Sequence, residues 1–410
     1  KKKKSYYYKP NNMISISNLV FRMKKNAVGL ATIAILSSMV LVTLVGAASI
    51  YAGKKDYLAS ATPHDYSVAG NKVDLTSTKK LMDDFLIKTG EQANEEVAVS
   101  YLLFGIKNQE TNKLTVFTKN ERKVVPKSIV LVFSQETFKQ LTGKELNLSS
   151  NQIALYTKNK TLKTQKSLSI DGKNYQIHRQ LGDFINKKIP NIYKIIVSDY
   201  SYLVVPDIKI FESSMKGTSI TQATYVGVNV KNPTHDAKKN LDLLDQIAGE
   251  ATKQLDSQTT GVPVSYFSAN SRYDAEGMVN GFVGGTFFIG IFLSIIFMLG
   301  TVLVIYYKQI SEGYEDRERF VILQKIGLDD LQVKQTIRKQ VLTVFFLPLI
   351  FSFIHLAFAY HMISLIVRII GVLNPDLMLV VTIIVCGVFF LAYIMVFVLT
   401  SRSYRRIVSM

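Results

Sequence analysis

The sequence predicts a polytopic α-helical membrane protein with four transmembrane helices and a large mixed α+β extracellular domain between the first and the second helix. Three observations predict this class. Four long runs contain no Asp, Glu, Lys or Arg, residues 54–276 between the first two runs mix helix and strand signals, and Lys and Arg gather in the short flanks.

The predicted transmembrane helices cover residues 26–53, 277–307, 341–367 and 377–401. Each run exceeds the roughly 20 apolar residues that an α-helix needs to cross a hydrocarbon core. A helix buried inside a soluble domain can be equally apolar, but four such runs in one chain favour the membrane.

Charge predicts the orientation of these helices. Residues 1–26 carry eight Lys or Arg and no acid, and residues 402–410 carry three Arg and no acid. Lys and Arg in short flanks mark the cytoplasmic side. We therefore expect both ends of this chain and residues 308–340 in the cytoplasm, with residues 54–276 and the short loop 368–376 outside the cell membrane. The net charge of +18 is spread over these tails and does not indicate a nucleic-acid partner.

The beginning of the chain, KKKKSYYYKPNN, has no initiator Met. The first 26 residues also lack the layout of a signal peptide, because the apolar run that follows is too long. We expect a piece of a longer chain, or a processed chain.

Residues 1–25 are predicted to hold a basic cytoplasmic tail and an interfacial amphipathic helix beside membrane lipids. Met13, Ile16, Val20 and Met23 fall on one face of that helix. The alternative is that the first span simply starts here and its lysines reach back to the interface.

The extracellular domain alternates helix and strand signals without a detectable repeat. Residues 75–90 have the spacing of an amphipathic helix that ends at Gly90, and residues 236–255 have that of a long polar helix. Asp171-Gly172 between two alternating runs predicts a two-residue hairpin. Strands are expected at residues 128–134, 152–158, 193–199, 202–207 and 224–230.

Catalytic and metal-binding patterns are missing from the sequence. The five histidines never have metal-ligand spacing, and H-E-x-x-H, C-x-x-C and G-x-x-x-x-G-K-[ST] do not occur. We therefore expect no enzymatic activity, no metal and no bound nucleotide in this chain. His355 in the third predicted span is either a proton-relay group or a neutral imidazole bonded to a neighbouring helix. Cys386, the only cysteine, is expected to pack in the fourth span, so the extracellular domain has no disulfide available.

Residues 310–340 form the most charged run in the second half of the chain, with six acids and six bases. Acids crowd the start of residues 315–326, Gly327 suits a helix C-terminus, and Asp329 and Asp330 can begin a second helix. Apolar side chains such as Phe320 need either a lipid surface or a protein partner outside the bilayer. We therefore favour a partner-docking element over a solvated connector.

Two stretches resemble a known family of transporters. YYKQISEGYEDRERFVILQKIGL, followed by VKQTIRKQVLTVFFLPLIFSFIHLAFA, is similar to the closing half of FtsX-like ABC transporter permeases of the bacitracin-export type. Residues 6–51 are similar to the segment of that type which leads into the membrane span before the large extracellular domain. The resemblance covers both ends of the chain, whereas over the extracellular domain it rests on size and position.

The resemblance implies a ten-span permease of Gram-positive bacteria, of which this chain would hold spans seven to ten. It implies a separate cytoplasmic ABC ATPase, expected as a homodimer that binds ATP and Mg, and a membrane histidine kinase. The implied role is resistance to cell-wall-targeting antimicrobial peptides such as bacitracin or lantibiotics, by freeing lipid-linked cell-wall intermediates from the drug.

Energy would then enter through the partner, and a rigid helix pair at residues 308–340 could transmit the closure of that partner to the membrane. The residues predicted at the ATPase contact are Glu315, Asp316, Arg317, Arg319, Phe320, Gln324 and Gly327. Three glycines near the outer end of the second span are predicted to allow close helix packing, with ordinary glycine content as the alternative. These are Gly281, Gly284 and Gly285.

Other functions stay open on the sequence. The same topology suits an FtsX-like permease for lipoprotein release, macrolide-type efflux or cell-division signalling, a non-transport membrane sensor, or, least favoured, a membrane enzyme. Residues 54–276 hold 30 Lys or Arg against 24 Asp or Glu. This surplus favours a phosphate-bearing ligand, a lipid-linked intermediate alone or with a peptide, over a free cationic peptide. The alternative is that the surplus only solubilises the domain.

Overall fold

The computed structural model describes most of residues 27–408. The segments outside the described residues are 1–26, 122–125, 191–196, 198, 232–236, 256–264, 326–329, 371, 373 and 409–410. The chain folds into two compact units: a helical unit of residues 1–53 and 282–410, and a strand-rich unit of residues 54–281. The predicted interfacial helix in residues 1–25 lies outside the described residues.

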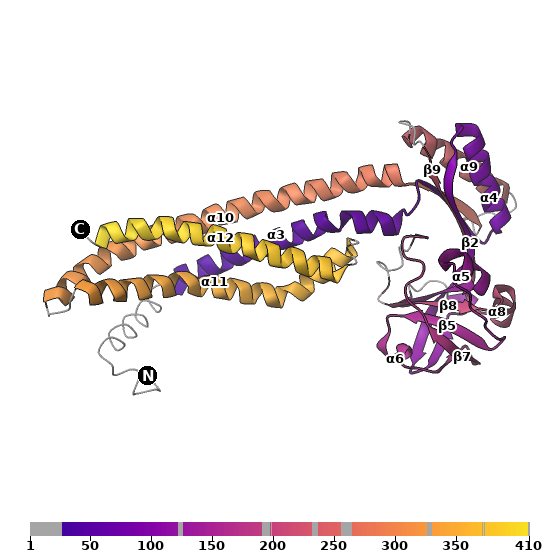
Figure 1. The fold of residues 1–410 in the computed structure, drawn as a ribbon, viewed down its shortest axis with the longest axis horizontal. Helices are drawn as coiled ribbons and strands as arrows, with labels where there is room; N and C mark the ends of the chain where they lie inside the picture. Colours follow the sequence, from indigo (N-terminus) through magenta and orange to yellow (C-terminus); the bar gives the residue numbers. More distant parts are fainter. Residues whose placement is uncertain are drawn as a thin grey trace. The chain divides into compact units, whose positions relative to one another are not determined.

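Four long helices contain the predicted spans (Figure 1). They are α3 (Ala27–Ala61), α10 (Arg272–Lys325), α11 (Asp330–Ile369) and α12 (Pro375–Val408). Each is long and apolar enough to cross a membrane. Many of their exposed side chains are large and apolar, including Phe288, Phe292 and Phe358, and such surfaces suit hydrocarbon better than water.

The helices extend beyond the predicted spans. α10 begins at Arg272 and continues without a break to Lys325, so the first expected cytoplasmic helix is the end of α10. α11 begins at Asp330, where the second helix was expected to start. Gly327, the predicted junction, lies outside the described residues.

Polar side chains and small residues join the helices of the helical unit. Thr43 on α3 lies 2.9 Å from Ser294 on α10, hydroxyl to hydroxyl, and Gly290 leaves the space that Ala47 fills. Between α11 and α12, the Tyr393 hydroxyl donates a hydrogen bond to the Phe345 carbonyl at 2.9 Å. Small residues and buried hydroxyls are the usual means of holding helices together where water is absent.

The described residues of the strand-rich unit contain ten strands joined in one sheet, in the order β10-β1-β9-β2-β3-β6-β7-β5-β8-β4. The strands are β1 (Tyr66–Asn71), β2 (Ala93–Glu110), β3 (Lys113–Val116), β4 (Ser128–Ser134), β5 (Gln152–Thr157), β6 (Ser167–Ile170), β7 (Lys173–Gln180), β8 (Asp199–Val205), β9 (Thr221–Val230) and β10 (Tyr266–Ser271). Because β4 also pairs with β2, the strands from β2 through β3, β6, β7, β5 and β8 to β4 close into a barrel.

The first part of β2 belongs to a second layer. Residues Ala93 to Leu103 of β2 pair with β9, which pairs with β1 and then β10. Helices α4 (Leu75–Thr89) and α9 (Ala237–Leu255) pack on these four strands around buried Phe85 and Leu244. We call this part the α/β layer; in Figure 1 its helices lie beside β9 and β2.

The barrel has its own apolar interior. Leu102, Phe104, Val130, Leu155 and Leu203 are among its buried side chains. Three short helices accompany the barrel: α5 (Gln135–Thr142), α6 (Lys160–Lys163) and α8 (Ile208–Ser214). The α/β layer and the barrel therefore each have an apolar cluster, and a further cluster, which includes Tyr101, Phe133 and Tyr225, packs on strands of both parts.

Several local predictions are confirmed by turn and cap geometry. The Asp74 carboxylate accepts a hydrogen bond from the Ser77 amide at 2.8 Å and begins α4, and Gly90 ends that helix in the left-handed conformation at φ 71°. Asp171 and Gly172 both have positive φ between β6 and β7, as a two-residue hairpin turn requires. Of the strand predicted at residues 193–199, only Val197 and Asp199 are described, and Asp199 begins β8.

Replacing Gly227 in β9 with Ala is expected to destabilise the strand-rich unit. The added methyl group would collide with the His64 ring and the Tyr225 hydroxyl, and overpacking of this kind typically costs about 1–3 kcal/mol. Amide hydrogen exchange of β9 in the purified chain measures the effect.

Gly249→Ala in α9 is the matched control. Its methyl group meets no described atom within 4 Å, and a Gly-to-Ala change inside a helix stabilises by roughly 0.5–1 kcal/mol. If both variants shifted exchange in the same direction, the close packing at Gly227 would be contradicted.

Candidate functional site

Metal-binding and thiol chemistry have no assembled site in the part of the chain that the structure describes. Within the described residues, no group of three or more His, Cys, Asp or Glu side chains is placed to hold a metal ion. Cys386 is half-buried on α12 and unpaired. Two other features remain: a polar cluster inside the strand-rich unit, formed by residues that follow the end of α3 and by the first residue of α10, and a groove between α3 and α11.

The polar cluster begins at Arg272, the first residue of α10. Its backbone amide donates to the Asp65 carbonyl at 2.9 Å, and its Nε donates to the Thr62 carbonyl at 3.1 Å. Its Nη1 lies 3.3 Å from the Asp65 carboxylate. Thr62 directly follows the end of α3, so one arginine binds the end of α3 to the start of α10.

Asp65 extends these contacts to β9. Its second carboxylate oxygen accepts a hydrogen bond from the Val230 amide at 3.0 Å, and its own amide donates to the Asn229 side chain at 3.2 Å. The Asn229 amide in turn donates to the Glu95 carboxylate of β2 at 3.0 Å. Asp65 is buried, and a buried carboxylate requires such compensating donors.

His64 completes the cluster. It is buried at 3% exposure, its Nδ1 lies 2.9 Å from the Tyr225 hydroxyl, and Gly227 provides space for its ring. Burial lowers the pKa of His64 to about 4, and burial also raises the pKa of Tyr225. Both side chains are therefore neutral at pH 7 and serve as fixed packing and hydrogen-bonding groups.

We call Thr62, His64, Asp65 and Arg272 the joint. The strands beside the joint also connect its two sides, because β1 pairs with both β10 and β9. The end of α3 and the start of α10 are thus held to each other and to β9 by backbone, side-chain and ionic contacts. A displacement of either helix end has to move β9 or break these bonds.

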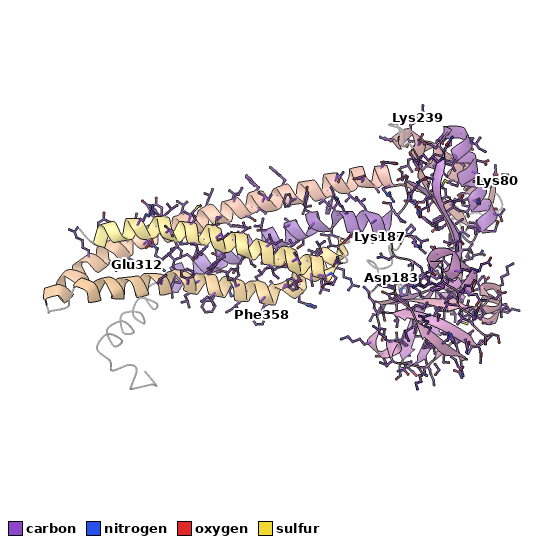
Figure 2. The ribbon with its side chains drawn as sticks, viewed as in Figure 1. Lys80, Asp183, Lys187, Lys239, Glu312 and Phe358 are labelled. Carbon is purple, nitrogen blue, oxygen red and sulfur yellow. The ribbon has the colours of Figure 1, made fainter. Side chains whose placement is uncertain are left out.

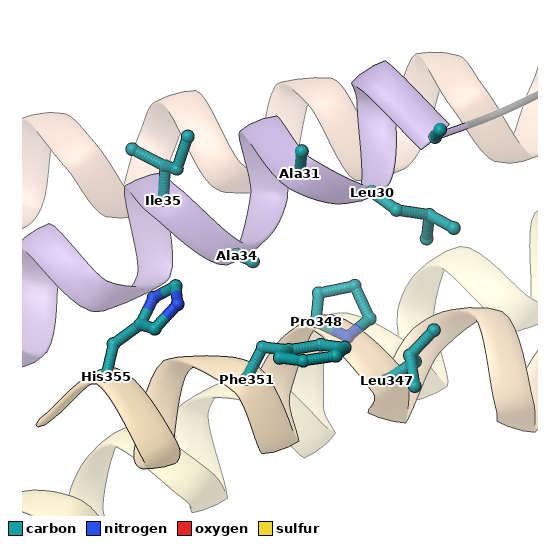
Figure 3. Close-up of a pocket in the computed structure, with 9 residues that line it drawn as sticks. Leu30, Ala31, Ala34, Ile35, Leu347, Pro348, Phe351 and His355 are labelled. Carbon is teal, nitrogen blue, oxygen red and sulfur yellow. The ribbon is translucent and has the colours of Figure 1, made fainter. Parts of the chain in front are cut away.

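The groove lies between α3 and α11 and has a volume of about 380 Å³ (Figure 3). Apolar side chains of both helices make up most of its lining, with Leu30 and Ile35 on α3 and Leu347 and Phe351 on α11. His355 stands at one end of the groove, and its Nδ1 lies 3.1 Å from the Ser38 hydroxyl of α3. This contact supports the reading of His355 as an imidazole bonded to a neighbouring helix.

The predicted ATPase contact lies at the end of α10. Glu315, Asp316, Arg317, Arg319, Phe320 and Gln324 all fall on this helix. Asp316, Phe320 and Gln324 follow each other at spacings of four and therefore share one face of it. Glu315 and Arg317 are exposed, whereas the other four side chains lie outside the described set. The contact stays a prediction.

The three predicted packing glycines sit on α10 without close neighbours. A Cβ placed on Gly281, Gly284 or Gly285 would meet no described atom within 4 Å. Close approach occurs at Gly290 instead, against Ala47 of α3. A packing role for the three glycines therefore has no partner among the described residues and stays a prediction about contacts with other segments.

Sequence reasoning missed the joint. His64 and Asp65 follow the first span, and Arg272 precedes the second, so each looked like an ordinary residue at the edge of a domain. Their pairing depends on β1 and β10 being neighbours in the sheet. No local signal marked the pair, because Asp65 lies twelve residues after the first apolar run and Arg272 lies five residues before the second.

The chain was compared with protein families and with curated proteins, and it resembles several bacterial permeases. No family model matches the chain. It is 23% identical over 367 residues to the ABC transporter permease protein YxdM of Bacillus subtilis, which covers 88% of this chain and 53% of that protein. It is 21% identical over 420 residues to the uncharacterized ABC transporter permease YvcS of the same organism, covering 99% and 60%.

A third relative is the bacitracin export permease protein BceB of Bacillus subtilis, 21% identical over 369 residues, covering 88% of this chain and 52% of that protein. The similarity to BceB is no greater than to the other two, so the bacitracin type is not singled out. The chain spans about half the length of these curated relatives. With its four apolar helices, it is a multi-pass membrane protein similar to ABC transporter permeases.

Proposed function

We propose that the chain is part of the membrane subunit of an ABC transporter that gives resistance to cell-wall-targeting antimicrobial peptides of the bacitracin or lantibiotic type. The observation that carries this proposal is α10. One uninterrupted helix runs from Arg272 in the joint to the predicted ATPase contact near Lys325. With 54 residues, it is about 80 Å long, far more than the roughly 30 Å of a hydrocarbon core.

In this proposal α10 transmits movement between its two ends. A cytoplasmic ABC ATPase, acting as a homodimer that binds ATP and Mg, closes on the end of α10 and the start of α11. A helix is stiff along its axis, so displacement at that end reaches the joint, where Arg272 and Asp65 pass it to β9. Ligand binding to the strand-rich unit acts on the ATPase by the same route in reverse.

The proposed partners follow from this arrangement. The ligand is a lipid-linked cell-wall intermediate, alone or with its peptide, and a membrane histidine kinase receives the signal. Residues 54–276 face outward, and both ends of the chain lie in the cytoplasm. The relatives support the permease role, and the charge asymmetry of the flanks supports the orientation.

Phe320→Asp is expected to abolish peptide resistance and co-purification of the ATPase while the permease stays inserted in the membrane. A charge in place of the Phe320 side chain would oppose an apolar contact with the ATPase. The measurements are growth in bacitracin and pull-down of the ATPase with the whole permease.

Ile210→Asp on α8 is the control, because Ile210 is 65% exposed in the strand-rich unit, far along the chain from the contact. It is expected to leave recruitment unchanged. Full resistance together with normal ATPase recruitment in Phe320→Asp would contradict the proposal that the end of α10 docks the ATPase.

Orientation is testable with single cysteines in a Cys386→Ser background. Lys158→Cys and Lys239→Cys, both exposed in the strand-rich unit, are expected to react with an impermeant thiol reagent in whole cells. Glu318→Cys should react only after the cells are permeabilised. Labelling of Glu318→Cys in intact cells would reverse the proposed orientation.

Arg272→Gln is expected to weaken coupling across the joint. Loss of its bonds to Asp65 and Thr62 should destabilise the strand-rich unit by about 1.5–3 kcal/mol, the range for hydrogen bonds to charged groups. Stimulation of ATP hydrolysis by bacitracin should fall, with basal hydrolysis unchanged. The readout is the ratio of stimulated to basal ATPase activity of the reconstituted complex.

Lys79→Gln provides the comparison for Arg272→Gln. Lys79 pairs with Glu96 at 3.0 Å on the surface of the strand-rich unit, and a surface ion pair of this kind contributes at most about 1 kcal/mol. Its stimulated-to-basal ratio should match that of the unmodified chain. An unchanged ratio in Arg272→Gln as well would argue against coupling through the joint.

A further inference from the structure

Charge is unevenly divided between the two parts of the strand-rich unit. Residues 102–220, which include most of the barrel, hold 19 Lys or Arg and 9 Asp or Glu. The rest of residues 54–276, which make up most of the α/β layer, hold 11 Lys or Arg and 15 Asp or Glu. The modest overall surplus therefore conceals a strongly basic barrel beside a mildly acidic layer.

Four cations gather at one end of the barrel, and we call Lys160, Lys163, Lys166 and Arg179 the basic end. α6 is the helix that follows β5 along the chain (Figure 1). It buries Leu162 in the barrel core and leaves Lys160 and Lys163 exposed. Because Leu162 is buried in the barrel core, it holds α6 in place and with it the two lysines.

The other two cations come from the neighbouring strands. The Lys166 carbonyl accepts a hydrogen bond from the Ile177 amide at 2.9 Å, which places Lys166 beside the last residues of β7. Arg179 belongs to those residues and is paired in register with Ala154 of β5, the strand that leads to α6. The four residues therefore come from α6, the position directly before β6 and the end of β7, at the same end of the barrel.

The four side chains of the basic end are exposed, and none of them forms an ion pair with a described residue. Some other lysines of the strand-rich unit are paired, as in Lys107 with Glu121 at 2.6 Å and Lys139 with Glu145 at 2.5 Å. The carboxylate of Asp199, which the chain brings close to α6, accepts a hydrogen bond from the Asn159 side chain at 2.8 Å.

We propose that the basic end of the barrel binds the headgroups of anionic phospholipids. The strand-rich unit is tethered at both of its ends to helices long and apolar enough to cross a bilayer. A lipid surface is therefore always present at high effective concentration. Four cations on flexible stems from three elements match a surface of many distributed negative charges.

The expected strength follows from the number of charges. A Lys or Arg near an anionic membrane contributes about fivefold in binding, and the attraction falls off within a Debye length. Losing all four should therefore abolish lipid contact at the basic end. This inference does not depend on the ATPase, so it can fail or hold independently of the proposed function.

The chain contains no Trp, so a single introduced Trp reports from one place. Ser167→Trp puts this reporter at the exposed start of β6, next to Lys166, in the full chain reconstituted in nanodiscs. Energy transfer to dansyl-labelled headgroups is measured in discs with phosphatidylglycerol and in discs of phosphatidylcholine alone. We expect strong transfer only with the anionic lipid, and its loss when salt rises from about 0.1 M to 1 M.

Two controls isolate the basic end. Ile87→Trp places the reporter on α4, where Ile87 is 78% exposed, and it should not respond to lipid charge. Changing all four residues of the basic end to Gln should abolish transfer from Ser167→Trp. The same change at four exposed lysines of the α/β layer should not, although it removes as much charge. These are Lys80, Lys88, Lys239 and Lys253, of which Figure 2 labels Lys80 and Lys239.

Three results would overturn the inference. The first is equal transfer in anionic and neutral discs, and the second is equal loss with the two sets of Gln substitutions. The third is a saturable change in Ser167→Trp fluorescence on addition of inorganic pyrophosphate in phosphatidylcholine discs. That result would identify a site for a soluble phosphate in place of a lipid surface.

Discussion

The ion pair between Asp65 and Arg272 closes the base of the strand-rich unit, and the rest of that unit is built on this closure. Residues 54–281 are inserted between two long apolar helices, so the chain has to leave α3 and return to α10 through neighbouring positions. Arg272 holds these positions together because its side chain contacts both the Thr62 carbonyl and the Asp65 carboxylate. The Asp65 carboxylate also accepts a hydrogen bond from the Val230 amide of β9. The antiparallel pairing of β1 with β10 holds the same two ends through the backbone.

The strand β2 connects the α/β layer to the barrel. Its first part pairs with β9 in the α/β layer, and its later residues pair with β4 and β3 in the barrel. One apolar cluster lies around Phe85 and Leu244 in the α/β layer and another around Phe104 and Leu203 in the barrel. A further cluster with Tyr101 of β2, Phe133 of β4 and Tyr225 of β9 packs on strands of both parts. Because packed cores resist gradual deformation, movement of the barrel would be expected to reach the joint through β2 and β9. A basic barrel bound to lipid would then be coupled to the start of α10.

Much of the architecture was predictable because it depends on local physics. A single uncharged run in lipid satisfies its backbone hydrogen bonds by forming a helix, which is why the four predicted spans fall in long apolar helices of the structure. The caps at Asp74 and Gly90 and the turn at Asp171-Gly172 depend on residues close in sequence. The prediction failed for β1, β10 and the first part of β2, where exposed Asn94, Glu95 and Glu96 gave no strand signal. These residues are extended because β9 lies beside them.

The sequence by itself therefore determined the multi-pass membrane class, the positions of the four long apolar helices found among the described residues, and the absence of recognisable nucleotide and metal motifs. Only the tertiary structure decided that Asp65 meets Arg272, that seven strands close into a barrel, and that Lys160, Lys166 and Arg179 share one end of it. The reason is physical. Helix formation and capping are decided within a few residues, whereas these contacts join residues that are far apart in the chain and become neighbours only once strand order and register are set.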